Sequence, residues 1–283
     1  MTPHPVLDEL VAEIGELRPL PAVAVRILQI AGEDRLSAPE LATAIASDQA
    51  LTAKILRLAN SAYYGFPRRI TTVRDAVVLL GFRTIRSTAL ASSVMDTLRG
   101  ANDLDQERFW HYSVTVGALA ELLAKARRQH LDEAFTAGVL HNVGRLALDQ
   151  HRPGALAAAR EMASTEGITV ARAEQTILGF TDSELGAGLA AHWSFPPALR
   201  DAIAHHQLDV AALPDPASLE AFVVRARLFA RANGTSDGVE PVEQTAPQSE
   251  WLTLPLAPLL RNAGGFEGIQ SRALAFVETT SSS

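Results

Sequence analysis

Helical periodicity runs through almost the whole chain, and this pattern constrains the fold more than any other feature. Apolar residues recur at helical spacing in one segment after another, beginning with Val6 to Glu16. Prolines, glycines and capping residues separate these segments, and Ser37-Ala38-Pro39-Glu40 carries the signal of a helix start. No alternation of apolar and polar residues indicates a strand. The sequence therefore predicts an all-α protein.

Two polar stretches divide the helical pattern. Residues 100–106 separate an N-terminal helical subdomain, residues 1–100, from a second helical region, residues 101–232. Residues 233–248 are rich in Gly, Thr, Ser, Asp, Glu and Pro, which is the composition of a mobile connection, so we assign 233–250 as a linker. Residues 251–283 are moderately apolar and predict a C-terminal helical extension that packs back on the body.

The composition narrows the class of protein. Hydrophobic residues make up 47% of the 283 residues, which is enough for a substantial core. The absence of cysteine excludes disulfides and thiolate chemistry. The chain has no apolar run of membrane-spanning length, and its first residues lack the features of a secretory signal. We expect a cytoplasmic protein with no membrane insertion.

The charge is unevenly distributed. The net charge of −7 argues against a chain devoted to nucleic acid, which we do not expect as the main partner. Seven basic residues nevertheless fall in one stretch opposed only by Asp75: Lys54, Arg57, Arg68, Arg69, Arg74, Arg83 and Arg86. This basic stretch is either a solvated face or a surface for an acidic partner, a nucleotide or nucleic acid.

The doublet His141-Asn142 resembles a metal site in which one ligand has been replaced. A histidine followed by an aspartate at this point would be typical of adjacent ligands of a hydrolytic metal. Asn142 is neutral, and half of its polar surface is a hydrogen-bond donor that repels a metal ion. The chain therefore has the pattern of a hydrolase that has lost its catalytic metal chemistry.

A hydrolytic metal centre needs neutral imidazoles and at least one carboxylate converging from several helices. If the helices pack side by side, the candidate ligands are His111, His141, Asp182 and His206, or His205 in its place. Arg145 is then a candidate for holding a phosphate. A histidine on an apolar helix is more often a core residue with satisfied hydrogen bonds, so both interpretations stay open. We expect no cofactor, or at most one weakly bound divalent metal ion.

Several segments resemble the HDOD domain, an output-domain relative of the HD phosphohydrolases. The resemblance covers roughly residues 15 to 232 and is most specific in the N-terminal half. The matching segments are Leu17 to Pro21, Val25 to Leu28, Ile45 to Gly65, Ile70 to Phe82, Phe109 to His111, Ala137 to Gly144, Glu184 to Ala187, Trp193 to Pro196 and Ala202 to His206.

The resemblance implies an N-terminal helical subdomain packed on an HD-like helical bundle. By position it places the metal ligands of HD phosphohydrolases at His111, His141, Asn142, Asp182 and His206. This chain departs from the pattern at two of them. Asn142 replaces the aspartate of the doublet, and Asp182 stands where relatives often have histidine. The first departure removes a negative charge from the site, and the second restores one elsewhere.

Three functions follow as hypotheses. The resemblance favours a non-enzymatic bacterial regulatory module with a degenerate metal site, which acts through contacts with signalling proteins in trans. The first alternative is a metal-dependent phosphohydrolase or phosphodiesterase acting on a nucleotide or cyclic dinucleotide. The second is a nucleotide or nucleic-acid binder that uses the basic stretch. Whether the chain is an enzyme stays undecided at this point, although the missing carboxylate favours the non-enzymatic module.

Overall fold

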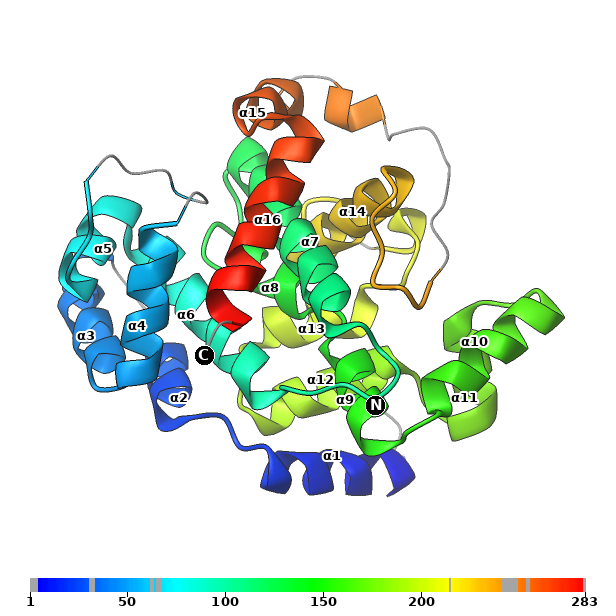
Figure 1. Ribbon diagram of the computed structural model, residues 1–283. Helices are drawn as coiled ribbons and strands as arrows, with labels where there is room; N and C mark the ends of the chain where they lie inside the picture. Colours follow the sequence, from blue (N-terminus) through cyan, green and yellow to red (C-terminus); the bar gives the residue numbers. More distant parts are fainter. Residues whose placement is uncertain are drawn as a thin grey trace.

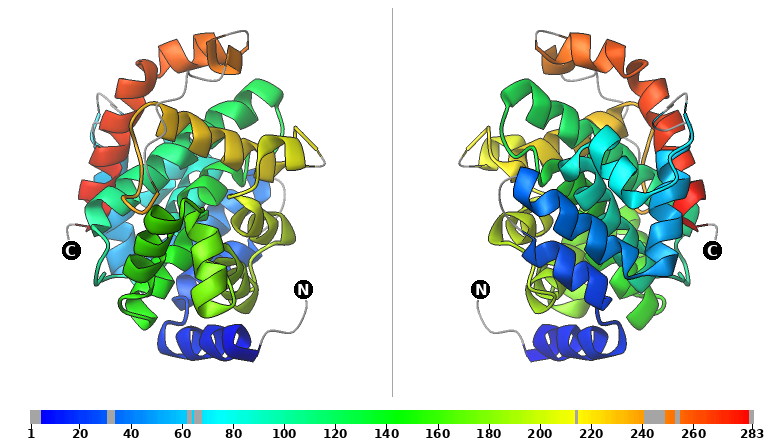
Figure 2. Two further views of the ribbon diagram at one scale, coloured as in Figure 1. Left: turned by 90° about the vertical axis from the view of Figure 1, so that its right-hand side faces the viewer. Right: turned by 90° about the vertical axis from the view of Figure 1, so that its left-hand side faces the viewer.

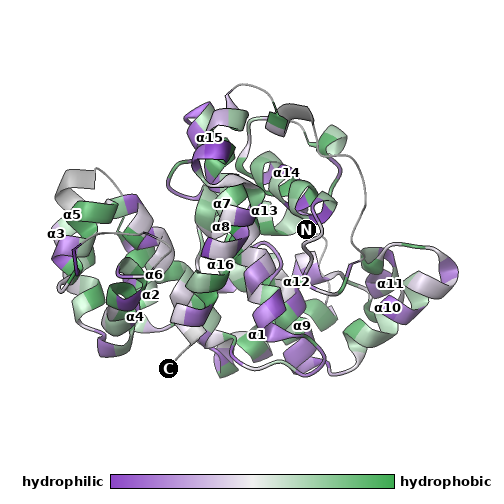
Figure 3. Cartoon of the chain, turned by 45° about the horizontal axis from the view of Figure 1, so that its top comes forward, coloured by the Kyte–Doolittle hydropathy of each residue, from purple (hydrophilic) through white to green (hydrophobic). Residues whose placement is uncertain are grey.

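The computed structural model of the protein describes residues 5–30, 34–61, 64, 68–213, 215–240, 249–252 and 255–281 (Figure 1). All regular secondary structure in these ranges is helical, which confirms the all-α prediction. Within the same ranges, no helix combines the length and the apolarity that crossing a bilayer requires. Colouring by hydropathy shows most helices carrying both hydrophilic and hydrophobic residues (Figure 3).

The N-terminal helices pack in two different places. A compact group contains α2 (Ala22–Gln29), α3 (Asp34–Ala46), α4 (Gln49–Ala59), α5 (Val73–Leu80) and α6 (Phe82–Thr97), which pack on one another. The first helix, α1 (Pro5–Leu17), instead packs against α12 in the second half of the chain. Figure 2 shows α1 at one end of the molecule and α15 at the opposite end.

The second half is a helical bundle built around the long helix α7. Its helices are α7 (Gln106–Arg127), α8 (Ala134–Leu140), α9 (Val143–His151), α12 (Asp182–His192), α13 (Pro197–His205) and α14 (Leu219–Ala232). A hairpin of α10 (Ala155–Glu166) and α11 (Val170–Leu178) projects from it, and short 3₁₀ turns lie at Val210–Ala212 and Ser249–Leu252. Helices α15 (Leu256–Asn262) and α16 (Gly265–Ser281) follow, and α16 packs on α7 and α4.

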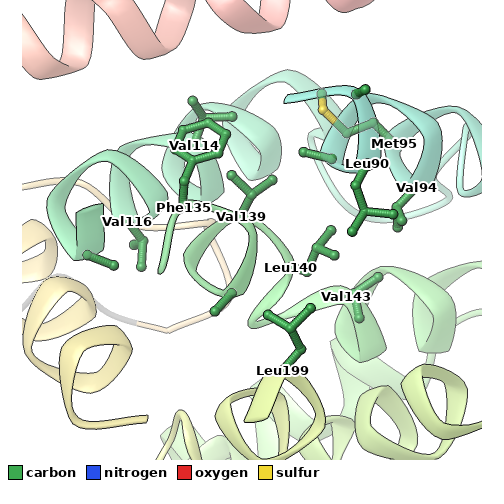
Figure 4. Packing of buried hydrophobic residues seen from close by; sticks show 14 of the residues in the cluster. Leu90, Val94, Met95, Val114, Val116, Phe135, Val139, Leu140, Val143 and Leu199 are labelled. Atoms are coloured by element: carbon green, nitrogen blue, oxygen red, sulfur yellow. The ribbon is translucent and has the colours of Figure 1, made fainter. Parts of the chain in front are cut away.

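A continuous apolar core joins the two halves. Leu90 and Val94 of α6 lie beside Leu140 of α8, Val139 of α8 faces α7, and Leu199 of α13 lies beyond Leu140 (Figure 4). All five side chains are buried, so α8 lies between the N-terminal group and the rest of the bundle. Because His141 follows α8 directly, this packing fixes the position of the His141-Asn142 doublet.

Two helix starts differ from the sequence-based expectation. Helix α3 begins at Asp34 rather than after Ser37, so Pro39 lies inside the helix and removes one of its hydrogen bonds instead of starting it. The first residue of α12 is Asp182, whose residue type favours the cap position itself. The cap is Thr181, which forms a reciprocal capping box with Glu184. This arrangement leaves the Asp182 side chain available to the interior of the bundle.

Candidate functional site

A buried guanidinium lies at the centre of the bundle. Arg145 of α9 is only 2% exposed and is ion-paired with carboxylates from distant parts of the chain. Its Nη1 donates to Asp237 at 2.6 Å, and its Nη2 donates to Glu240 at 3.2 Å. Its Nε lies 3.0 Å from Asp182 Oδ2 without the alignment of a hydrogen bond. A buried charge is tolerated only when it is compensated in this way, and here the chain supplies the compensation itself.

Close helix packing sets the distance between Arg145 and Asp182. At Gly144, α9 approaches the start of α12 so closely that an added Cβ would lie 1.9 Å from the Asp182 carbonyl oxygen. Gly186 on α12 faces it, and a Cβ there would lie 3.0 Å from the Gly144 amide nitrogen. The two glycines therefore bring the backbones together, which places Arg145 beside Asp182.

The buried charges balance. Burial, together with the charge of Asp182, raises the pKa of Glu174 to about 9, so this carboxyl group is protonated near neutral pH. It accepts a hydrogen bond from the Asp182 backbone N–H at 2.9 Å. Glu240 also pairs with two arginines of α14, Arg227 and Arg231. The network therefore contains three carboxylates and three guanidinium groups: Asp182, Asp237 and Glu240, and Arg145, Arg227 and Arg231.

His141 and His206 are the two candidate ligands that the structure brings side by side. Their ring centroids are 5.0 Å apart, and both side chains are buried. Each Nδ1 lies against a backbone carbonyl, at 2.7 Å for His141 and 2.8 Å for His206, so each Nδ1 carries the proton. Burial and the charge of Arg227 lower the pKa of His206 to about 3, and burial and the neighbouring His206 lower the pKa of His141. Both rings are therefore neutral, with Nε2 unprotonated.

Asn142 has a specific role in this centre that aspartate could not take. Its Oδ1 accepts a hydrogen bond from Ser113 at 3.0 Å, and its Nδ2 donates to Asp237 at 3.4 Å. An aspartate at this position would place a second carboxylate against Asp237 and lose the donor. The amide at 142 and the carboxylate at 237 are thus complementary.

Two of the predicted ligands lie away from this centre. His111 Nε2 is hydrogen-bonded to the Gln270 carbonyl of α16 at 3.0 Å, so the ring contributes to packing between α7 and α16. His205 lies on the surface, where its Nδ1 is 2.9 Å from Glu220. Successive residues at the end of α13 therefore face opposite ways, and His206 is the inward one.

The residues that do meet do not fit a hydrolytic metal centre. Two neutral imidazoles are suitable ligands, but such a site needs a third protein ligand. The neighbouring carboxylate, Asp182, is held by Arg145 and accepts a hydrogen bond from Gln207 at 2.6 Å. Among the described residues, no three His, Asp or Glu side chains are grouped so as to hold a metal ion. The cation that Asp182 faces is Arg145. This arginine is paired with carboxylates of the protein itself, so it is not open to a ligand's phosphate.

The structure divides the basic stretch into paired and exposed residues. Lys54 is buried and paired with Asp96, and burial lowers its pKa despite that partner. Arg83 pairs with Asp132 at 2.7 Å, and Arg86 Nε donates to the Ile27 carbonyl at 3.4 Å. The remaining four are exposed: Arg57, Arg68, Arg69 and Arg74. The basic stretch therefore presents less positive charge at the protein surface than the sequence suggests.

Sequence reasoning missed the segment that closes the site. We expected residues 233–248 to be a mobile linker, but Thr235, Ser236 and Asp237 are buried against the bundle. Residues 241–248 lie outside the described ranges. We call residues 234–240 the strap; Figure 1 shows it leaving the end of α14 and running toward α10. A signal was present in α14, where Arg227 and Arg231 are buried in the helix and require anions as partners.

The Glu240 ion pairs predict a stability that is lost in acid. Burial alone would raise the pKa of Glu240, but the charges of Arg145, Arg227 and Arg231 lower it from 4.5 to about 2. The stabilisation is therefore complete above pH 4.5 and disappears as the pH falls through about 2; its full size is roughly 3 kcal/mol. Urea unfolding of wild type and Glu240→Gln from neutral pH down to about pH 2.5 measures it. The wild-type advantage should shrink on acidification, and a constant difference would contradict the assignment.

Comparisons with known proteins agree with this fold. The HDOD domain family matches residues 17–208 of this chain. A solved HDOD domain protein of unknown function from Geobacter sulfurreducens is 26% identical with a TM-score of 0.74, and the match covers 98% of this chain and 95% of that one. A protein from Shewanella amazonensis SB2B, whose proposed activity is that of a phosphohydrolase, is also 26% identical, with a TM-score of 0.72 over 96% of this chain and 97% of that one.

A curated relative matches the sequence over part of its length. This uncharacterized protein of Treponema pallidum (strain Nichols) is 25% identical over 237 residues, which are 82% of this chain and 45% of that protein. The chain thus spans less than half the length of this relative. The strap falls after residue 208, so its carboxylates lie outside the matched segment. With the helical bundle, the histidine pair and the matched residues 17–208 in view, the chain belongs to the HDOD domain family.

Proposed function

We propose that this protein is a non-enzymatic signal-transduction module in which the HD-type centre has become a structural ion-pair network. The observation that carries the proposal is the pairing of Arg145 with Asp182, Asp237 and Glu240. A divalent cation at this centre would compete with a guanidinium that the fold already holds in place. Hydrolysis of a phosphodiester in such a centre relies on a metal ion that lowers the pKa of bound water. The residues here favour a rigid closed centre over that chemistry.

One alternative has an observation in its favour. His141 and His206 each have Nδ1 bound to a backbone carbonyl, which is the orientation that metal-binding histidines usually adopt. A metal-dependent phosphohydrolase acting on a nucleotide or cyclic dinucleotide would use this pair, with Asp182 released from Arg145. The similar Shewanella protein, with its proposed phosphohydrolase activity, points the same way.

Turnover assays separate the two functions. We expect wild-type protein supplied with Mn²⁺ to hydrolyse bis(p-nitrophenyl) phosphate and cyclic dinucleotides no faster than the His141→Ala variant does. The matched control is His205→Ala, which alters an exposed ring one position from the buried pair. Mn²⁺-dependent turnover that is abolished in His141→Ala and kept in His205→Ala would overturn the non-enzymatic proposal.

The proposal also requires a protein partner in trans, and the exposed arginines of the basic stretch offer a surface for an acidic one. Arg68 and Arg74 are exposed, and neither belongs to the closed centre. The Arg68→Glu, Arg74→Glu double variant should lose proteins that wild type captures from a lysate of the source cell at low salt. An Arg127→Glu, Arg172→Glu variant, reversing two exposed charges on α7 and α11, should retain them. Equal capture by both variants would remove the basic stretch from the proposal.

A further inference from the structure

A cleft of about 1110 Å³ lies directly beside the closed centre. The α10–α11 hairpin forms one wall, and α14 contributes Arg227 and Arg231 to the other. The strap contributes Ser236, Gly238, Val239 and Glu240 to the lining. The cleft is large enough for a small organic ligand, and it is separated from Arg145 by the strap residues that pair with that arginine.

The cleft carries four arginines, and the strap pairs with three of them. Arg227 Nη1 donates to Glu240 Oε2 at 3.1 Å, and Arg231 Nη1 is ion-paired with the same oxygen at 2.7 Å. Arg108 donates from Nε to the Ser236 carbonyl at 3.1 Å and from Nη2 to its hydroxyl at 2.9 Å. The fourth, Arg160, is exposed at the rim. The Glu240 carboxylate thus occupies the place on α14 where a bound anion would be held.

A phosphate is a better partner for these arginines than a carboxylate. It offers more oxygens and more negative charge, and guanidinium groups bind it through two parallel hydrogen bonds. Arg227 has a further donor for such an anion, because its Nε is buried and has no hydrogen-bond partner among the residues that the structure describes. The donors therefore exceed what Glu240 uses.

An anion can displace the strap, because ion pairs with arginines hold it in place. The contacts of the strap are mostly polar and charged, and Val239 is its one residue in the apolar cluster with Ala159, Ala163, Val170 and Ala173. Gly234 and Gly238 give it two bends in the left-handed region of the backbone, at φ of 85° and 89°. Once Glu240 leaves Arg227 and Arg231, it also leaves Arg145. The ion pair between Arg145 and Asp237 is then no longer reinforced by the Arg145–Glu240 pair beside it.

We propose that this cleft binds a small phosphorylated molecule whose phosphate replaces Glu240 on Arg227 and Arg231 and thereby releases the strap from Arg145. The inference rests on the proposed regulatory function, for which the ligand would be the input signal. The strap is an internal mimic of that ligand, with a carboxylate standing in for a phosphate.

Inorganic pyrophosphate is the probe that tests the cleft, by isothermal titration calorimetry on the full chain in metal-free buffer with chelator. We expect saturable binding that weakens by at least about tenfold in Arg227→Gln and in Arg231→Gln, because each loses a charged hydrogen bond to the phosphate. Glu240→Gln should bind more tightly than wild type, since the internal competitor is weakened. Arg172→Gln, an exposed residue of α11 outside the cleft lining, is the matched control and should bind like wild type.

Amide hydrogen exchange of residues 235–240 reports the release of the strap. Saturating pyrophosphate should increase their exchange, whereas binding without displacement would leave or increase their protection and overturn the proposal. Absent or unsaturable binding by both wild type and Glu240→Gln would also overturn it. These readouts involve no metal and no turnover, so hydrolytic activity would refute the proposed function and leave the cleft assignment to be decided by its own experiment.

Discussion

Replacing Arg145 with methionine should lower the free energy of unfolding by roughly 3–5 kcal/mol, the usual effect of removing one partner from a buried charge network. The substitution keeps the volume of the side chain near that of arginine but leaves Asp182 and Asp237 buried without their common cation. Chemical denaturation at neutral pH measures the loss, and circular dichroism checks that the helical content is retained.

The matched control for this variant lies just beyond the same helix. Arg152 follows the end of α9 and is 42% exposed, with Glu13 at 3.6 Å as its partner. Arg152→Met should change the free energy of unfolding by less than about 1 kcal/mol, as for most exposed ion pairs. If Arg145→Met costs no more than Arg152→Met, the buried network does not stabilise the fold as described.

Gly144→Ala should destabilise the protein at least as strongly as the loss of Arg145, by about 3 kcal/mol or more. The added methyl would lie 1.9 Å from the Asp182 carbonyl oxygen and 2.5 Å from the Gly186 amide nitrogen, which are backbone atoms that cannot turn aside. Helices α9 and α12 would have to separate, so Arg145 and Asp182 would move apart as well. Thermal unfolding followed by circular dichroism measures the effect.

Gly188→Ala provides the control on the facing helix. A Cβ at Gly188 would meet the end of the Val11 side chain at 2.7 Å, and a side chain of α1 can shift where a backbone cannot. We expect a loss of no more than about 1 kcal/mol, since alanine also favours the helix. Equal melting temperatures for the Gly144→Ala and Gly188→Ala variants would contradict a tight crossing at Gly144.

Much of the fold was predictable because helical periodicity and turn residues act locally. The same local patterns could not place the ends of α3 and α12, since Pro39 tolerates a position inside its helix and Thr181 competes with Asp182 for the cap. Short-range signals identify candidate caps, but the packing of neighbouring helices decides which candidate is used.

The candidate site was predictable only in part. The family resemblance pointed to His141, Asn142, Asp182 and His206. The structure places His141 beside His206, and it links Asn142 to Asp182 through Asp237 and Arg145. The resemblance did not reveal that His111 faces α16, because the direction of a side chain on a long buried helix depends on long-range packing. Asp237 was missed for a similar reason: its segment has the composition of a linker, and only the buried arginines of α14 and α9 explain why it is ordered.

Metal binding tests the central claim most directly, which is that Arg145 provides the cation of this centre. Calorimetric titration with Mn²⁺ should show no saturable binding to wild type, because Asp182 and Asp237 are already paired. The Asn142→Asp, Arg145→Met double variant should bind one Mn²⁺ per chain, since it restores a carboxylate beside His141 and removes the competing guanidinium. Stoichiometric binding of Mn²⁺ to wild type, at an affinity equal to that of the double variant, would contradict the account.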